Sequence, residues 1–179
     1  QTGRKKFMAA LAALRVKPLT ARRRNKVEVS YLIRRAVRQF EHNVAVAVPG
    51  GERLSFREIN ERSNRLAQGL LSLGLKKGDR VALLLFNSKE YLEAYLALAK
   101  AGLVRVSLNT RLSAQEHAYM LADSESRAII VAEEFAEHIL GIKPSLKELH
   151  WLISLGQATG EELPYEHFLS SFSAEELHV

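Results

Sequence analysis

The sequence predicts an α/β fold with a mostly parallel sheet, crossover helices and a short antiparallel hairpin. Residues Val81 to Phe86 form an unbroken run of six apolar residues, which is typical of a strand covered on both faces. Candidate strands begin near Val81, Val104, Ala128 and Trp151, so 23, 24 and 23 residues separate their starts. Each interval holds one short helix and two tight connections. Such units form parallel sheets with right-handed crossovers.

Residues 1–28 are predicted to be a basic amino-terminal arm that includes a short amphipathic helix. Phe7, Leu11 and Leu14 share one face at helical spacing, and Pro18 would end the helix. The apolar run is short and Arg15 interrupts it, so the arm is not predicted to be a secretion signal. Two interpretations remain open, namely packing of this helix on its own domain or a partner subunit, and binding to a membrane surface.

Residues 29–179 are predicted to form the α/β domain, which begins with a helix and a hairpin. Apolar residues at helical spacing predict a helix over Val29 to Phe40, with Ser30 as its N-cap. The short strands Val44 to Val48 and Arg53 to Phe56 flank the turn Pro49 to Glu52, which predicts an antiparallel hairpin.

Three helices are predicted from their terminal residues. Ser55 with Glu58 forms a capping box that opens a helix, and Gly74 is placed to end it. Asn87 with Glu90 has the spacing of a reciprocal cap, and its largely apolar helix continues to Gly102. A second capping box is formed by Ser113 with Glu116.

The later strands differ in their predicted burial. Val104, Val106 and Leu108 alternate with polar residues, so this strand is expected to have one less buried face or to lie near a sheet edge. The remaining elements are predicted to be a strand over Ala128 to Val131, a helix over Glu133 to Leu140, a last convincing strand over Trp151 to Leu155, and a short helix over Tyr165 to Phe172.

The charge is strongly segregated along the chain. Residues 1–40 carry twelve Lys and Arg against one acid, a net charge of +11, and residues 41–179 carry fourteen against nineteen, a net charge of −5. The basic run Arg22 to Lys26 is typical of a solvated face, and a mildly acidic body does not indicate nucleic-acid binding. The chain has no cysteine, which excludes disulfides and thiolate metal sites, and no apolar run approaches the roughly 20 residues that span a bilayer.

The sequence contains no self-sufficient catalytic motif. The connection Phe86 to Lys89 lacks both GxGxxG and GxxxxGK[ST], so it is not predicted to cradle a nucleotide phosphate. There is no GxSxG elbow for a serine nucleophile. The paired glutamates at 133 and 134, 161 and 162, and 175 and 176 are expected to be solvated.

The histidines and the residues at the ends of the strands are the remaining candidates for a catalytic or binding role. The six histidines are scattered with no two at i, i+4, so each is predicted to be an ordinary surface or boundary residue. Asn109 to Arg111 follow a parallel strand, at the edge where open α/β sheets bind ligands, and both a structural turn and a ligand contact remain open. The sequence therefore predicts no catalytic, cofactor-binding or metal-binding residue in this chain.

Several short motifs occur together in an order that resembles one enzyme family. They are Leu54 to Ile59 (LSFREI), Lys77 to Ala82 (KGDRVA), Asn87 to Glu90 (NSKE), Ala99 to Gly102 followed by Leu108 and Asn109, and the segment Asn109 to Val131. In this order and spacing, the region Val29 to Val131 resembles the amino-terminal part of the adenylate-forming (AMP-binding) enzymes, and most of all the acyl-CoA synthetases. Two residues depart from the family pattern, Arg105 where a small or apolar residue is usual and Ser107 where proline is usual.

The resemblance implies an amino-terminal portion of the acyl-CoA synthetase-like fold. It implies a parent enzyme that uses ATP, Mg²⁺ and CoA to convert a fatty acid or related carboxylate into its CoA thioester. The family's phosphate loop, adenine motifs and mobile-domain lysine all follow the matched region, so this fragment is expected to be structural and inactive. The expected partners are the remainder of its own polypeptide and the carboxylate substrate, in the cytoplasm, with a homodimer and contact with the inner membrane face left open.

A different class of function also remains open. The chain could be a standalone, non-catalytic α/β module that docks to a membrane or a protein partner through its basic arm. Uncovered apolar surface would favour the fragment over this alternative.

Overall fold

The computed structural model describes residues 29–157 and 160–177, and the predicted arm therefore lies outside the described residues. The described elements, in chain order, are α2 (Val29–Phe40), β1 (Val44–Ala47), β2 (Arg53–Ser55), α3 (Phe56–Ser72), β3 (Arg80–Leu84), α4 (Lys89–Ala101), β4 (Val104–Ser107), α5 (Ala114–Asp123), β5 (Ala128–Val131), α6 (Glu133–Ile142), η1 (Lys143–Ser145), β6 (Trp151–Ser154), β7 (Leu163–Pro164) and α7 (Tyr165–Ser170).

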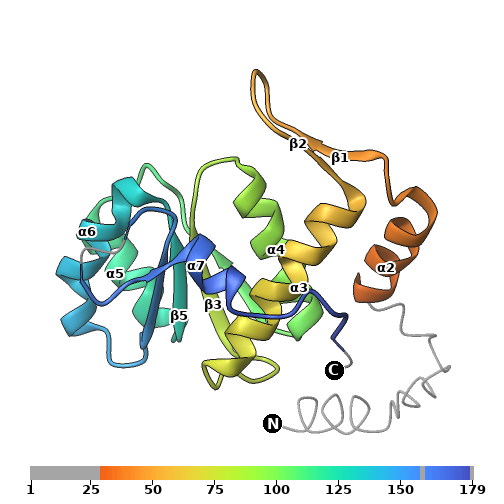
Figure 1. Cartoon of the computed structure of the whole chain (residues 1–179). Helices are drawn as coiled ribbons and strands as arrows, with labels where there is room; N and C mark the ends of the chain where they lie inside the picture. Colours follow the sequence, from red (N-terminus) through yellow and green to blue (C-terminus); the bar gives the residue numbers. More distant parts are fainter. Residues whose placement is uncertain (1–28, 158–159, 178–179) are drawn as a thin grey trace, which may run out of the picture.

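A parallel sheet forms the centre of the domain. Its five strands lie in the order β4-β3-β5-β6-β7, and every neighbouring pair is parallel. Figure 1 shows α5 and α6 on one side of the strands, with α3 and α4 on the other. The predicted α/β class is therefore confirmed, and so is the edge position of β4.

The side chains of each strand alternate between two cores. In β3, Val81 and Leu83 pack with α3, α4 and α7, whereas Ala82 and Leu84 pack with α5 and α6. All four are fully buried, as is all of β5. Burial on both faces explains why these strands are continuous apolar runs rather than alternating sequences.

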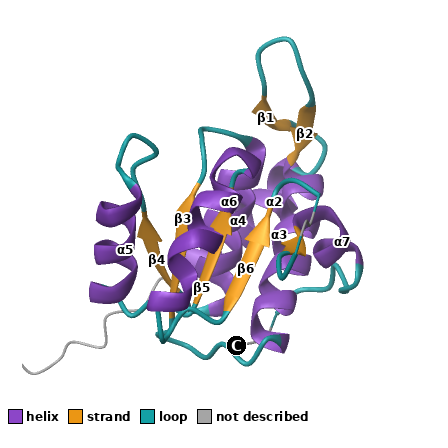
Figure 2. Ribbon diagram, turned by 90° about the vertical axis from the view of Figure 1, so that its left-hand side faces the viewer, coloured by secondary structure: helices purple, strands orange, loops and turns teal. Residues whose placement is uncertain are grey.

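A local unit precedes the sheet. Strands β1 and β2 pair antiparallel and lead directly into α3, whose capping box has Ser55 accepting from the Glu58 amide while the Glu58 carboxylate accepts from the Ser55 amide. In Figure 2 this hairpin projects past the end of the sheet to which the strands point. The predicted hairpin and both predicted capping boxes are confirmed.

Glycines end two of the predicted helices as expected. Gly102 closes α4 in the left-handed conformation, with φ at 68°, and Gly74 follows α3 with φ at 85°. Glycine adopts this region without the steric cost that a Cβ brings.

Several sequence predictions at element ends were wrong. Ser30 is the second residue of α2 and is not its N-cap, because the helix already begins at Val29. The returning hairpin strand stops at Ser55, since Phe56 opens α3. Strand β6 is not the last, because the short strand β7 pairs with it. A two-residue strand containing proline carries too little pattern to be found from sequence.

We predict that Gly69→Ala destabilises the protein by about 1–3 kcal/mol, because overpacking a full core strains it. A Cβ at Gly69, inside α3, would lie 2.6 Å from the Phe168 ring. The matched control is Gly141→Ala in α6, where a Cβ would meet nothing within 4 Å. The control should gain about 0.5–1 kcal/mol from helix propensity. Urea unfolding measures both, and equal stabilisation of the two variants would contradict the packing of α7 on α3.

Candidate functional site

The carboxyl edge of the parallel sheet is the natural place for a ligand. Open α/β sheets bind ligands outside this edge, at the point where neighbouring strands connect in opposite directions. Here that point lies between β3 and β5. The chain leaves β3 through α4 on one face of the sheet and leaves β5 through α6 on the other face.

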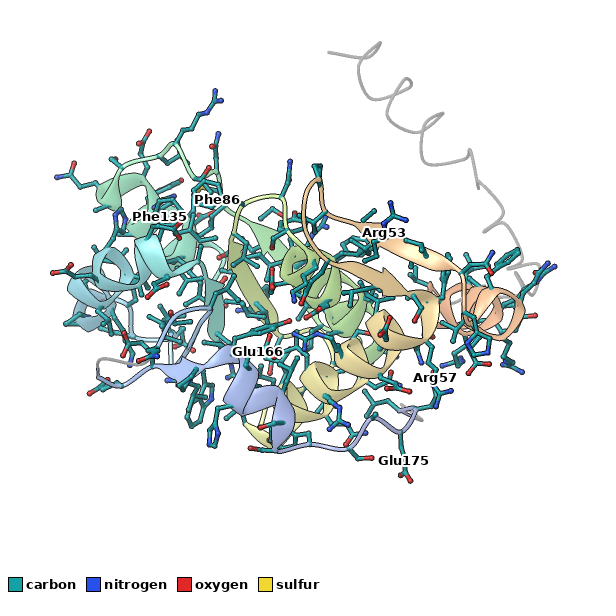
Figure 3. The ribbon with its side chains drawn as sticks, turned by 45° about the horizontal axis from the view of Figure 1, so that its top comes forward. Arg53, Arg57, Phe86, Phe135, Glu166 and Glu175 are labelled. Atoms are coloured by element: carbon teal, nitrogen blue, oxygen red, sulfur yellow. The ribbon has the colours of Figure 1, made fainter. Side chains whose placement is uncertain are left out.

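Two phenylalanines occupy this point. Phe86 follows β3 and Phe135 lies on α6, with ring centroids 5.4 Å apart and the two side chains adjacent in Figure 3. The prediction that Phe86 belongs to the buried strand was wrong. It lies past the last paired residue and is 49% exposed. The surface between the ends of β3 and β5 therefore carries an aromatic pair, of which Phe86 is exposed.

The connection from β3 to α4 offers no phosphate cradle. Its helix is capped by Ser88, whose hydroxyl accepts from the Tyr91 amide, so the prediction of Asn87 as the cap was wrong. A cap residue must accept from the second or third helical amide, and the helix starts one residue later than the motif suggested. Lys89 forms ion pairs with Glu52 of the hairpin and with Glu90, so its ammonium is already paired within the chain.

The connection after β4 is a tight turn. The Asn109 side chain accepts from the Arg111 amide at 3.0 Å, and the Asn109 carbonyl accepts from the Leu112 amide at 3.2 Å. Asparagine favours such turns because its side chain can replace a backbone acceptor. Of the two interpretations of Asn109 to Arg111, the structural turn accounts for the Asn109 contacts, while Arg111 is exposed.

The prediction that every histidine is an ordinary surface or boundary residue was wrong for His117. His117 on α5 is fully buried. Its Nδ1 lies 3.1 Å from Nε2 of His138 on α6, and its Nε2 lies 2.9 Å from the Asn109 carbonyl. The sequence placed these histidines 21 residues apart, and only the packing of α5 on α6 brings them together.

The pKa of His138 is lowered in this position. Burial, followed by the neighbouring charge of His117, lowers the pKa of His138 from its ordinary value. Both effects disfavour a charged imidazole.

An open pocket lies beside the same edge. Its walls come from the start of α6, the end of β6 and the segment from β7 into α7, and the lining residues are Glu133, Leu155, Gly156, Gln157, Pro164, Glu166 and His167. A Cβ at Gly156 would lie 2.5 Å from the exposed Glu133 side chain, which would have to move. No charged group in this lining is buried, since Glu133, Glu166 and His167 are all exposed.

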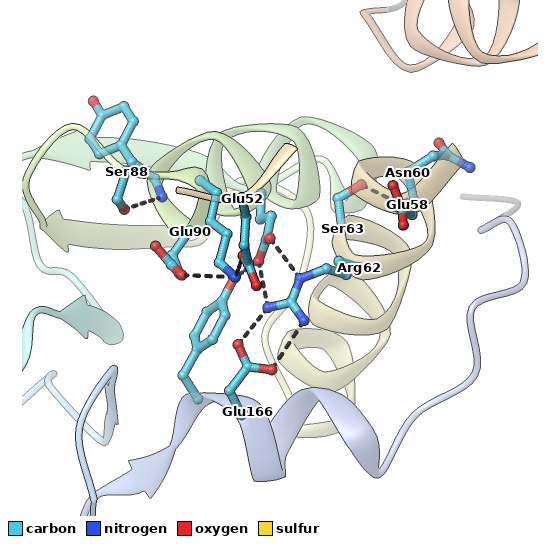
Figure 4. Close-up of polar contacts among 12 residues, drawn as sticks. Glu52, Glu58, Asn60, Arg62, Ser63, Ser88, Glu90 and Glu166 are labelled. Carbon is cyan, nitrogen blue, oxygen red and sulfur yellow. Dashed lines mark hydrogen bonds and ion pairs between the residues drawn. The ribbon is translucent and has the colours of Figure 1, made fainter. Parts of the chain in front are cut away.

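A buried ion-pair network lies beneath the edge (Figure 4). Glu93 on α4 is fully buried and receives two hydrogen bonds from the Arg62 guanidinium, at 2.6 and 3.1 Å. The buried Tyr165 hydroxyl also donates to Glu93, at 2.8 Å, and Arg62 reaches Glu166 on α7. This network therefore joins α3, α4 and α7.

The network keeps Arg62 charged and Tyr165 neutral. Burial opposes the charge on Arg62, but the hydrogen bonds that Arg62 donates to Glu166 and Glu93 raise its pKa overall. Burial, followed by the Glu93 charge, raises the pKa of Tyr165 well above its usual value, so this hydroxyl stays protonated. A phenol fixed as a donor and a carboxylate fixed as an acceptor make a structural bridge.

The buried Lys100 is linked through Asn60 to the carboxyl-terminal segment. Lys100 is 6% exposed, and its ammonium donates to oxygens of Asn60, Ser63 and Asn64 at distances between 2.7 and 3.1 Å. Burial lowers the pKa of Lys100 to about 8. Asn60 in turn donates to Glu176, so the prediction of a merely solvated glutamate was wrong there, as it was for the buried Glu162.

The sequence contains a signal for these buried charges. Glu93, Ala97 and Lys100 lie at helical spacing on the buried face of α4, where Ala94, Leu98 and Ala101 are also buried. A charged residue at an apolar position of a helix indicates a buried partner.

Within residues 29–157 and 160–177, no group of three or more His, Cys, Asp or Glu is placed to hold a metal ion. In the same part of the chain, no helix is long and apolar enough to cross a membrane.

Comparison with known proteins identifies the family to which this chain is similar. The profile of the AMP-binding enzyme family matches residues 33–175. Long-chain-fatty-acid–CoA ligase FadD13 of Mycobacterium tuberculosis strain H37Rv is 42% identical over 91 residues, which cover 51% of this chain and 18% of that protein. Feruloyl-CoA synthase from an Amycolatopsis species is 41% identical over 119 residues, which cover 66% of this chain and 24% of that protein.

The fold is shared with solved structures of such ligases. The inhibitor-bound N-terminal domain of FACL13 from Mycobacterium tuberculosis matches with a TM-score of 0.77 and 31% identity, covering 85% of this chain and 37% of that one. The chain spans between 18% and 28% of the length of the curated relatives it matches.

We predict that Glu93→Gln destabilises the protein by about 1–3 kcal/mol, because a buried amide cannot accept all three hydrogen bonds that Arg62 and Tyr165 donate to the carboxylate. The matched control is Glu61→Gln, which removes the carboxylate that pairs with Arg57, where both side chains are largely exposed at 41% and 56%. An exposed pair contributes little, so this variant should unfold like the unmodified protein. Equal unfolding midpoints for all three proteins in urea would show that Glu93 does not support the fold.

Proposed function

Because this chain belongs to the AMP-binding enzyme family, we propose that it is the amino-terminal part of an ATP-dependent acyl-CoA ligase. The observation that carries the proposal is the family match over residues 33–175, together with relatives that are CoA ligases several times longer than the matched region. In the complete ligase, ATP and a carboxylate would give an acyl-adenylate and pyrophosphate, and the thiol of CoA would then displace AMP.

The described residues do not fit the groups that this reaction requires. The connection after β3 has no glycine-rich backbone to surround phosphates, and its lysine is paired with Glu52 and Glu90. The partly buried Arg62 and the buried Lys100 are both paired with groups of this chain. ATP, Mg²⁺ and CoA are therefore proposed as ligands of the parent enzyme that this segment does not hold alone.

The geometry favours a structural role for this segment, in which it positions the ligand-binding edge of the sheet. The network of Arg62, Glu93 and Tyr165 fixes α3, α4 and α7 against the sheet and so fixes the connections at its carboxyl edge. Reacting groups supplied by other parts of a ligase would need such a rigid base, since small misplacements lower rates sharply.

The proposed substrate is a fatty acid or a related carboxylate. The names of three relatives support this class, since they specify a long-chain fatty acid, a medium-chain acyl group and ferulate. The proposed location is the cytoplasm, and contact with the inner membrane face or a homodimer would involve surfaces of the parent protein.

A second candidate function has one observation in its favour. Helix α2 carries three arginines and no acid, and its apolar side chains Tyr31 and Leu32 are 49% and 50% exposed. A basic, apolar helix of this kind suits an anionic surface. A standalone docking module would use α2 with the arm, whereas in a ligase the rest of the polypeptide would cover these side chains.

We predict that the isolated chain has no ligase activity. With ATP, Mg²⁺, CoA and a panel of fatty and aromatic acids, a coupled assay should detect no acid-dependent release of pyrophosphate. A full-length CoA ligase in the same assay is the positive control, and circular dichroism confirms that the fragment is folded. Pyrophosphate release that depends on the acid and scales with the amount of fragment would overturn the supporting role.

A further inference from the structure

The segment after α7, residues 172–177, lies along α3 (Figure 1), and we call it the strap. The strap contains no helix or strand, so contacts with other elements hold it in place. Three side chains of α3 donate to its backbone carbonyls, namely Asn64 to Ala174 at 2.8 Å, Arg65 to Phe172 at 2.6 Å and Gln68 to Glu175 at 2.9 Å.

The buried Lys100 of α4 lies beneath this row of donors. Its ammonium donates to the side-chain oxygens of Asn60 and Asn64, at 2.7 Å in each case. An ammonium has three donors and no acceptor, so each amide must present its oxygen to Lys100. The NH₂ group of each amide is thereby turned away from Lys100.

These two NH₂ groups meet the strap. The Asn64 nitrogen donates to the Ala174 carbonyl, and the Asn60 nitrogen donates to the Glu176 carboxylate at 2.9 Å. A reversed amide would place its oxygen against these acceptors and its NH₂ group against the ammonium. Lys100 therefore determines the donor pattern that α3 presents to the strap, although it does not touch the strap through a hydrogen bond of its own.

Apolar side chains attach both ends of the strap. The Phe172 ring packs edge-on against Phe168 of α7, with ring centroids 5.2 Å apart, and Leu177 packs against the core between the sheet and α3 and α4. The last strand pair, at Leu163 and Pro164, precedes the strap. Opening of residues 174–177 would therefore break no strand pair, which is the condition for a local opening of lower cost than global unfolding.

We propose that Lys100 is an internal latch for the strap. By fixing the amides of Asn60 and Asn64 as outward donors, it keeps residues 174–177 docked on α3, and the strap opens separately from the sheet when this orientation is lost. This conformational role goes beyond the proposed ligase function, because it concerns contacts within the described chain. In a longer ligase, polypeptide that continues past the strap would leave α3 at the position that the latch sets.

A single engineered thiol tests the latch. The sequence has no cysteine, so Ala174→Cys supplies one thiol in the strap. Its rate of reaction with the neutral reagent N-ethylmaleimide, relative to the rate in urea, measures how often the strap opens. On this background, Asn64→Asp still offers an oxygen to Lys100 but has no hydrogen for the carbonyl at position 174.

The rate should rise about tenfold in Asn64→Asp, the effect of losing one hydrogen bond. The added negative charge would by itself slow the thiol, because it disfavours the thiolate, so a faster reaction reports opening. The matched control is Asn87→Asp, which makes the same change of charge at an exposed amide after β3 and should leave the rate unchanged.

Two results of this experiment would overturn the proposal. Equal rates in Asn64→Asp, Asn87→Asp and the Ala174→Cys background would show that the amide orientation does not hold the strap. A faster rate accompanied by loss of the far-ultraviolet circular dichroism signal would show that the strap opens only with the whole domain.

The role of Lys100 itself is tested by Lys100→Met, which removes the three donors and keeps an unbranched side chain. With both asparagines free to turn, the thiol at position 174 should again react about tenfold faster. NMR spectra of the unmodified chain supply a test that does not depend on the folding of this variant. Nuclear Overhauser effects should connect the Asn64 NH₂ group to residue 174 and the Asn60 NH₂ group to residue 176, whereas effects to the Lys100 side chain instead would overturn the latch.

Discussion

The burial of the Glu93 carboxylate is the constraint on which the rest of this structure depends. A charge removed from water must be paired and hydrogen-bonded, and here a bidentate arginine and a phenol hydroxyl satisfy both oxygens. Glu93 lies on α4 and its two partners lie on α3 and α7, so one carboxylate fixes the relative positions of three helices on one face of the sheet. Arg62 extends the same bridge to Glu166.

That constraint positions the helices next to the sheet edge, where the described residues carry little chemistry of their own. Near this edge, Arg62 and Lys89 form ion pairs within the chain, Phe86 and Phe135 contact each other past the ends of the strands, and His117 contacts the carbonyl of Asn109 in the turn after β4. A segment of this kind suits a supporting part of a larger ligase, in which the reacting groups come from elsewhere in the polypeptide.

Much of the fold was predictable from sequence because its signals are local. The continuous apolar strands β3 and β5, the two capping boxes and the glycine that ends α4 are each determined by neighbouring residues. The site was less predictable, because its contacts join distant residues. Glu93 and Arg62 are 31 positions apart, and His117 and His138 are 21 apart. Helical periodicity places Glu93 on a face, but only tertiary packing supplies its partner.

The measurement that tests the central claim most directly is the intact mass of the native gene product, captured from its source with an antibody raised against this chain. As part of an acyl-CoA ligase, the captured polypeptide should have a mass several times the 20.1 kDa of this chain. It should also release pyrophosphate when ATP and an acid are supplied. A native mass near 20.1 kDa, with no such activity, would contradict the account and favour a standalone docking module.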